Sequence, residues 1–163
     1  MSIAAACIGA AACILAGGGA ARRLAEREKT LSAWEEKLIR MEGEARRGGA
    51  ALPALLREGS AGEKDALRAL ADRLEAEPAA DGEAAIRALP WPAAFSPEEK
   101  AALTECLRGL FSPEQESQLR ALQRAGEQWR RFTLAARENR EKNAALYRKL
   151  GWLAGAAVFI LLC

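Results

Sequence analysis

Apolar residues recur at helical intervals in the first third of the chain. Between residues 24 and 45 they stand three, four or seven positions apart, with charged residues at most positions between them. This period places the apolar positions on one face of a helix. The segment continues from the uncharged N-terminal run, so the two can form one long helix, with a flex point at 17–19, that ends at Gly48 and Gly49. The apolar face consists of Leu24, Leu31, Trp34, Leu38, Met41 and Ala45.

A second long helix is predicted toward the C-terminus, because no proline follows Pro113. Ser112 has the position of an N-cap, with proline next and Gln115 three residues on. Apolar positions then keep heptad-like spacing as far as residue 136, and the same phase afterwards meets a more polar stretch. We therefore expect the packed seam to loosen there. The face consists of Leu119, Leu122, Gly126, Trp129, Thr133 and Ala136, and the later stretch of Arg140, Asn143, Tyr147 and Leu150.

Shorter helices are predicted between the two long ones. One follows the glycines, with Pro53 tolerated in its first turn. Ser60 and Glu63 have capping-box spacing ahead of leucines at 67, 70 and 74, and Asp81 can cap a short helix that includes residues 86 and 89. The sequence Pro-Trp-Pro at 90–92 interrupts the chain, and Ser96 with the Pro-Glu-Glu that follows marks a further helix start.

The two ends of the chain carry no charged side chain. Residues 2–21 form an uncharged run of 20 residues, which spans about 30 Å as a helix, and the last 14 residues are also uncharged. A buried helix or a secretion signal are the alternatives for the first run, but a signal would need a basic segment before it. We expect membrane-anchoring helices at 1–21 and 150–163 and a helical bundle domain at 22–149, with the short helices packed at its distal end.

Small residues recur within both expected anchors. Gly9 stands on a small-residue stripe of the first anchor, and Gly151 and Gly155 form a GxxxG step in the second. Small residues let helix backbones approach closely in lipid, so these three glycines are candidate packing positions. Basic residues flank the anchors on the side of the middle domain, which favours a cytoplasmic middle domain and a multi-pass protein of the bacterial cell membrane.

Composition narrows the chemistry. The chain has 24 Lys and Arg, 22 Asp and Glu, a net charge of +2 and no histidine. The two signs are interleaved, which argues against a nucleic-acid surface. There is no phosphate-binding glycine loop and no Cys/His metal cluster, and Cys106 stands in an amphipathic helix, where a packed thiol is the default. We therefore expect no enzyme activity, cofactor or small-molecule substrate.

Three segments carry a resemblance to a known family. The first runs from the Arg-Arg-Leu at 22–24 to MEGEA at 41–45, Gly48 and Leu52, and the second combines Leu110 with Glu114 and SQL at 117–119. The third is KLGWLAG at 149–155 with the apolar tail. In this order and spacing they resemble stage III sporulation protein AB, a family of endospore-forming bacteria. Residues 57–100 match only in general character, and Leu107 and Phe111 stand where the family usually has glycines.

The resemblance implies a role in the channel-like complex between mother cell and forespore during engulfment. The protein would be a non-enzymatic platform in the outer forespore membrane, facing the mother cell. Its partners would be membrane lipid, a secretion-type ATPase like stage III sporulation protein AA, and other channel proteins, with a homo-oligomer also open. The alternative is a membrane-tethered helical adaptor or oligomerising scaffold unrelated to sporulation.

Three polar residues are candidates for contact with the ATPase. Glu42, Glu44 and Gln118 belong to the segments that carry the resemblance, yet they fall off the apolar stripe. A cytoplasmic ATPase must recognise exposed side chains. The alternative is that they are ordinary solvated residues of a helix surface, since most such charges contribute little.

Overall fold

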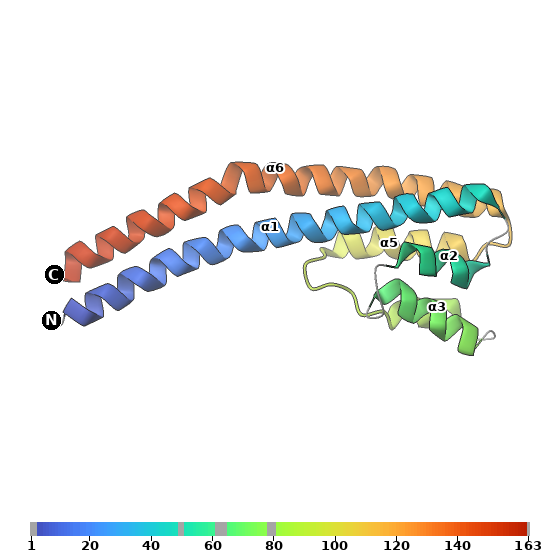
Figure 1. The fold of residues 1–163 in the computed structure, drawn as a ribbon, viewed down its shortest axis with the longest axis horizontal. Helices are drawn as coiled ribbons and strands as arrows, with labels where there is room; N and C mark the ends of the chain where they lie inside the picture. The colour runs from blue at the N-terminus through green and yellow to red at the C-terminus, as the bar shows by residue number, and fades with distance from the viewer. Residues whose placement is uncertain (1–2, 49–50, 61–64, 78–80, 163) are drawn as a thin grey trace. The chain divides into compact units, whose positions relative to one another are not determined.

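The computed structural model describes residues 3–48, 51–60, 65–77 and 81–162, with the backbone alone at 3–7, 9–10, 14, 159 and 161–162. Every regular element in these ranges is an α-helix, so the prediction of helices along the chain, an all-α fold, is confirmed. Two long helices, α1 and α6, flank four shorter ones in the sequence (Figure 1). The helices are α1 (Ile3–Arg47), α2 (Leu52–Gly59), α3 (Ala66–Ala76), α4 (Gly82–Arg87), α5 (Pro97–Leu110) and α6 (Gln115–Leu162).

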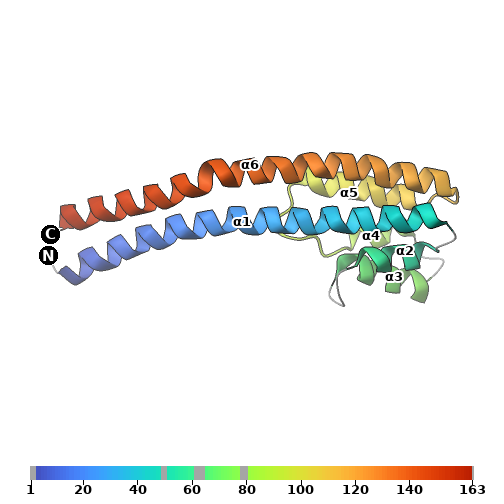
Figure 2. The same cartoon turned by 45° about the horizontal axis from the view of Figure 1, so that its top comes forward.

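The chain divides into two compact units. Unit 1 comprises residues 1–29 and 134–163, and unit 2 comprises residues 30–133. Both long helices contribute to both units, and within each unit α1 and α6 lie side by side (Figure 1, Figure 2). All four short helices belong to unit 2.

An aromatic cluster occupies the core of unit 2. Trp129 of α6 is completely buried, and its ring centroid lies 5.3 Å from that of Phe95 and 6.3 Å from that of Trp34. The indole Nε1 of Trp129 donates a hydrogen bond of 2.9 Å to the carbonyl oxygen of Leu31. Burial of each large side chain stabilises the fold by about 1.5–3 kcal/mol, and each ring pair adds about 0.5–1.5 kcal/mol. The cluster therefore joins α1, α6 and the segment before α5.

The predicted apolar stripes form most of this core. Five of the six stripe residues of α1 are buried, and Leu24 is partly buried. On α6, Leu122 is fully buried, but Ala125 is buried at the point where the stripe predicted Gly126. Gly126 is half-buried, and a Cβ built there meets no atom within 4 Å, so its prediction as a core position is wrong.

Several predicted helix ends are confirmed. Ser96 accepts a hydrogen bond from the Glu99 amide while the Glu99 carboxylate accepts one from the Ser96 amide, which is a complete capping box. Asp81 caps α4, and α1 ends at Arg47, before Gly48 with a φ of +80°. Glycine adopts this left-handed conformation without steric cost.

Two predicted helix starts are wrong. Ser60 follows α2 as its C-cap, and Asp65 is the N-cap of α3, accepting from the Leu67 amide at 3.1 Å. Glu63, the other half of the predicted capping box, lies outside the described residues. α6 begins at Gln115 and not directly after Ser112.

Tertiary contacts account for these shifts. Asp65 also forms an ion pair of 2.5 Å with the buried Lys37 of α1, which fixes the chain at that position. The side-chain amide of Gln115 donates to the Ala45 carbonyl oxygen at 2.8 Å, so the first residue of α6 is tied to the end of α1.

Unit 1 is built on close backbone approach between α1 and α6. A Cβ added at Gly17 would stand 2.6 Å from the Tyr147 carbonyl oxygen, and one at Gly151 would stand 3.1 Å from the Cys13 carbonyl oxygen. Both distances are shorter than ordinary contacts, so only glycine fits without a shift. Gly155 is buried, whereas the environment of Gly9 lies outside the described side chains.

The seam on α6 loosens in unit 1, as its polar stretch predicted. Tyr147 and Leu150, which continue the heptad phase, are 40% and 50% exposed. Arg140 does lie toward α1, with its Nε 2.8 Å from Glu28 Oε2. The contact is an ion pair without hydrogen-bond alignment, since Glu28 Oε2 has no hydrogen-bond partner among the described residues.

Among the described residues, no helix combines the length and the apolar character that crossing a membrane requires. The anchors at 1–21 and 150–163 remain predictions, and residues 1–2 and 163 lie outside the described ranges.

Candidate partner-binding surface

A surface groove of about 470 Å³ runs between α1 and α6 in unit 2. Its α1 residues follow the buried positions 34, 38, 41 and 45 by one residue each, which turns them about 100° around the helix from the core. Its α6 residues flank the same groove from the other side. The lining consists of Glu35, Ile39, Glu42 and Arg46 from α1 and Gln123, Gly126, Glu127 and Arg130 from α6.

The lining of this α1–α6 groove includes one exposed aliphatic side chain and one residue without a side chain. Ile39 is 60% exposed, and the Cβ position of Gly126 is open space. A glycine inside a helix costs about 1 kcal/mol relative to alanine, and no internal contact of the described chain requires it here. The pair gives the groove a shape that another helix or loop can enter.

Charged residues of both signs line the same groove as Ile39. Glu42 pairs with Arg46 of the same helix at 2.6 Å, and both side chains reach solvent. Glu35, Glu127 and Arg130 form no ion pair within the part of the chain that the structure describes. An incoming surface with basic and acidic groups around an apolar side chain would match this arrangement.

The three predicted contact residues do not come together. Glu42 lines the α1–α6 groove, whereas Glu44 pairs with Arg47 at 2.7 Å and does not line it. The amide of Gln118 donates to the carbonyl oxygens of Leu110 and Ser112, at 3.0 and 2.8 Å. Gln118 thus satisfies carbonyl groups at the end of α5, a role in the fold. Its contact with a partner stays a prediction.

Sequence reasoning missed Ile39, Gly126 and Glu127. Ile39 interrupts a charged face, and this was the signal available in the sequence: the stretch from Glu35 to Arg40 contains one aliphatic residue outside the stripe. Gly126 was assigned to the core because it keeps the heptad interval. The neighbouring Ala125 takes the buried position instead, and Gly126 lines the groove.

Cys106 has the properties of a packed thiol. It is 4% exposed, beside a hollow of about 110 Å³ between α5 and α6. Burial raises the pKa of its thiol to about 12, so the reactive thiolate is scarce at neutral pH. In addition, no three Cys, Asp or Glu side chains of the described residues come together as a metal site.

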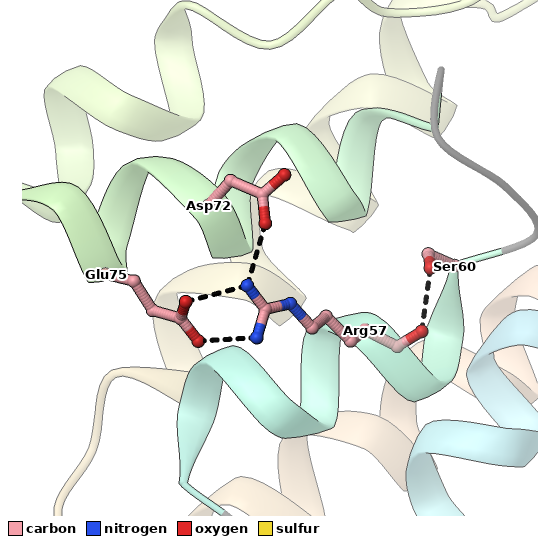
Figure 3. A network of polar contacts seen from close by, with 4 residues as sticks. All are labelled: Arg57, Ser60, Asp72 and Glu75. Carbon is pink, nitrogen blue, oxygen red and sulfur yellow. Dashed lines mark hydrogen bonds and ion pairs between the residues drawn. The ribbon is translucent and has the colours of Figure 1, made fainter.

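An exposed polar cluster joins α2 to α3. Arg57 of α2 holds the Glu75 carboxylate with two hydrogen bonds of 2.7 Å and reaches Asp72 at 2.9 Å (Figure 3). Ser60 closes the end of α2 by donating to the Arg57 carbonyl oxygen at 2.7 Å. The hydrogen bonds to Asp72 and Glu75 raise the pKa of Arg57. Because these charged groups pair with one another, the cluster holds two short helices together.

Comparison with known protein families matches residues 2–163 to stage III sporulation protein AB. A search of curated proteins and a search of solved structures each found no match. The family match covers essentially the whole chain, including the three segments whose order and spacing carry the resemblance. The chain therefore belongs to the stage III sporulation protein AB family.

Proposed function

We propose that this protein, whose family membership supports a role in sporulation, is a non-enzymatic membrane platform for a secretion-type ATPase. It would act in the complex between mother cell and forespore, with unit 2 in the cytoplasm of the mother cell. The ATPase, a protein like stage III sporulation protein AA, would bind the α1–α6 groove of unit 2. The observation that carries this proposal is the groove itself, which is lined by both the exposed Ile39 and the open Cβ position of Gly126.

The chemistry of the groove supports a protein partner. Interfaces between proteins combine apolar and polar groups, and a groove lined by Ile39 together with Glu and Arg side chains has that composition. Glycine at position 126 lowers the stability of α6 relative to alanine. Binding offsets this loss if a partner backbone or side chain occupies the open space.

Unit 1 supports the membrane part of the proposal. Its helices approach at Gly17 and Gly151, as small residues allow in lipid, where apolar burial does not drive helix association. The outermost stretches of both helices carry no charge, and basic residues flank them. Attachment to the outer forespore membrane would place unit 2 within reach of a cytoplasmic ATPase.

Affinity capture from sporulating cells tests the groove. We expect the full-length chain to capture the ATPase, and Ile39→Arg and Gly126→Leu to weaken capture at least tenfold, because both changes obstruct the groove. Leu134→Arg is the matched control, since Leu134 is 52% exposed but lies in unit 1. Normal capture by the folded groove variants would refute the site, and no capture by the wild-type chain would refute the ATPase as the partner.

Thiol labelling tests the orientation. Ser60, at the end of α2, is partly exposed and is suited to a single cysteine in a chain otherwise free of cysteine. We expect Ser60→Cys to resist a membrane-impermeant reagent in intact cells and to react after lysis. Rapid labelling in intact cells would place unit 2 on the other side.

A further inference from the structure

A second groove, of about 640 Å³, lies between α1 and α6 in unit 1. Three arginines line it, Arg22 from α1 and Arg140 and Arg148 from α6, against a single carboxylate, that of Glu141. Arginine stays protonated at any physiological pH and binds phosphate through its planar array of N–H donors. This basic groove therefore has the electrostatic character of an anion site.

Ion pairs inside unit 1 leave two of these arginines unneutralised. Arg140 pairs with Glu28 at 2.8 Å, and the carboxylate of Glu141 accepts from Arg137 at 3.0 Å. Within the described residues, Arg22 and Arg148 have no carboxylate partner. Among the residues that the structure describes, the Arg148 guanidinium makes one hydrogen bond, a long one of 3.4 Å to the Ala144 carbonyl oxygen. Both guanidinium groups are thus available to a ligand that enters the basic groove.

The remaining residues that line the groove have small side chains or none. Gly18, Ala21 and Ala25 of α1 face Ala144 and Ala145 of α6, and a Cβ added at Gly18 would meet no atom within 4 Å. The small residues keep the space between the arginines open. A volume of this size lies within the range of small-ligand pockets, which is about 300–1,000 Å³.

An apolar hollow adjoins the basic groove. It measures about 580 Å³ and shares Ala145 and Arg148 with the groove, so the two are continuous on α6. Its remaining lining is Lys149, Trp152 and Leu153, and Trp152 and Leu153 are each 67% exposed. An inorganic phosphate would use the arginines alone. A molecule with a phosphate and a hydrocarbon chain would use both surfaces.

We propose that the basic groove of unit 1 binds the phosphodiester headgroup of an anionic phospholipid, with Arg22 and Arg148 on the phosphate and an acyl chain against Trp152 and Leu153. This inference rests on the membrane attachment in the proposed function, because the lipid must be met at the bilayer surface. Basic pockets between helices at that depth bind anionic headgroups, and each arginine near the surface contributes a substantial share of the affinity. Binding would clamp α1 against α6 beside the expected anchors.

Native mass spectrometry of the full-length chain in nonionic detergent tests this site. The probes are tetraoleoyl cardiolipin, dioleoyl phosphatidylcholine, glycerol 3-phosphate and inorganic phosphate. We expect cardiolipin to bind preferentially. The double variant Arg22→Gln with Arg148→Gln should bind it at least about tenfold more weakly. The control is Arg23→Gln with Lys29→Gln, an equal change of charge in unit 1 at exposed residues outside both hollows. The control should keep wild-type affinity within about twofold.

Each contrary result has a distinct meaning. Equal binding of phosphatidylcholine, or equal loss in the control variant, would overturn the site, since diffuse charge would then explain the binding. Equal binding of glycerol 3-phosphate or inorganic phosphate would show that the acyl chain contributes nothing, which also overturns a lipid site. Flotation with phosphatidylcholine liposomes separates the two proposals. A chain that floats but shows no anionic preference refutes this inference alone, and a chain that does not float refutes membrane attachment.

Discussion

Replacing Gly17 with alanine tests the close approach of α1 and α6 in unit 1. The new Cβ would stand 2.6 Å from the Tyr147 carbonyl oxygen and 3.0 Å from the Gly151 Cα, both backbone atoms that cannot rotate away. The helices must therefore separate by several tenths of an ångström. Overpacking of this kind costs about 1–3 kcal/mol, while the gain in helix propensity from glycine to alanine is about 1 kcal/mol. The net expectation for Gly17→Ala is a loss of about 0–2 kcal/mol.

Gly18→Ala supplies the matched comparison. Gly18 is the next residue of the same helix, and a Cβ there meets nothing within 4 Å. The substitution should stabilise α1 by about 1 kcal/mol through helix propensity alone. The difference between the two variants, about 1–3 kcal/mol, then isolates the contact and cancels the propensity term. Such a difference corresponds to roughly a 5- to 150-fold change in an opening equilibrium.

Hydrogen–deuterium exchange of the full-length chain in lipid nanodiscs measures that equilibrium. Peptides from residues 22–29 and 134–149 should exchange faster in Gly17→Ala than in Gly18→Ala, because packing supplies most of the stability of a helix in a protein. Peptides from unit 2 should be unchanged and serve as the internal control. Equal protection in the two variants, or stronger protection in Gly17→Ala, would refute the close approach.

Three further predictions concern unit 2. Trp129→Ala should lower the free energy of unfolding by about 3–5 kcal/mol in denaturant titration, and Trp129→Phe should lower it less, because the ring contacts survive; equal losses would be inconsistent with the aromatic core. Asp65→Ala leaves the buried Lys37 ammonium without its carboxylate partner and should cost about 3–5 kcal/mol, more than the double variant Asp65→Ala with Lys37→Met, which removes both charges; the reverse order would refute the buried pair. Folding raises the pKa of Cys106 from 9.0 to about 12. The contribution of this thiol to the free energy of unfolding is therefore fully present below pH 9 and is lost as the pH rises from 9 to 12. That decline, measured by unfolding at each pH, should be shallower in Cys106→Ala.

The long helices could be predicted because their signal is local and periodic. On each long helix the apolar residues stand at intervals that a helix brings to one face. Three of them, Leu31 and Leu38 of α1 and Leu122 of α6, are all buried. The helix starts at Ser60 and Ser112 could not be predicted, because contacts between distant residues set the actual starts. Asp65 is held by Lys37, which lies 28 residues away, and Gln115 is held by Ala45, which lies 70 residues away.

The face of α6 that packs on α1 in unit 1 could not be predicted from the sequence either. Tyr147 stands 18 residues after Trp129, which is about five turns of an ideal helix, so helix geometry alone would face both side chains the same way. The glycine at 151 allows the backbone of α1 to approach, and this contact selects the face that carries Gly151 and Gly155. Sequence analysis named both glycines as packing positions without fixing their partners.

The candidate surfaces were the least accessible to sequence reasoning. Glu42 was identified from its family segment, and it does line the α1–α6 groove. Ile39 and Gly126 were not identified, because the groove forms between two helices and the sequence does not show how those helices are aligned. The basic groove has the same origin: Arg22 and Arg148 stand 126 positions apart in the sequence and meet only through the packing of α1 on α6.

Co-flotation with liposomes tests the central claim most directly. Purified ATPase is mixed with liposomes that carry the full-length chain, with empty liposomes, and with liposomes that carry the Ile39→Arg variant, and each mixture is centrifuged through a density gradient. A membrane platform predicts that the ATPase rises with the wild-type proteoliposomes and stays at the bottom in the other two mixtures. ATPase that remains at the bottom with correctly folded wild-type chain, or a chain that does not itself rise with lipid, would contradict the account.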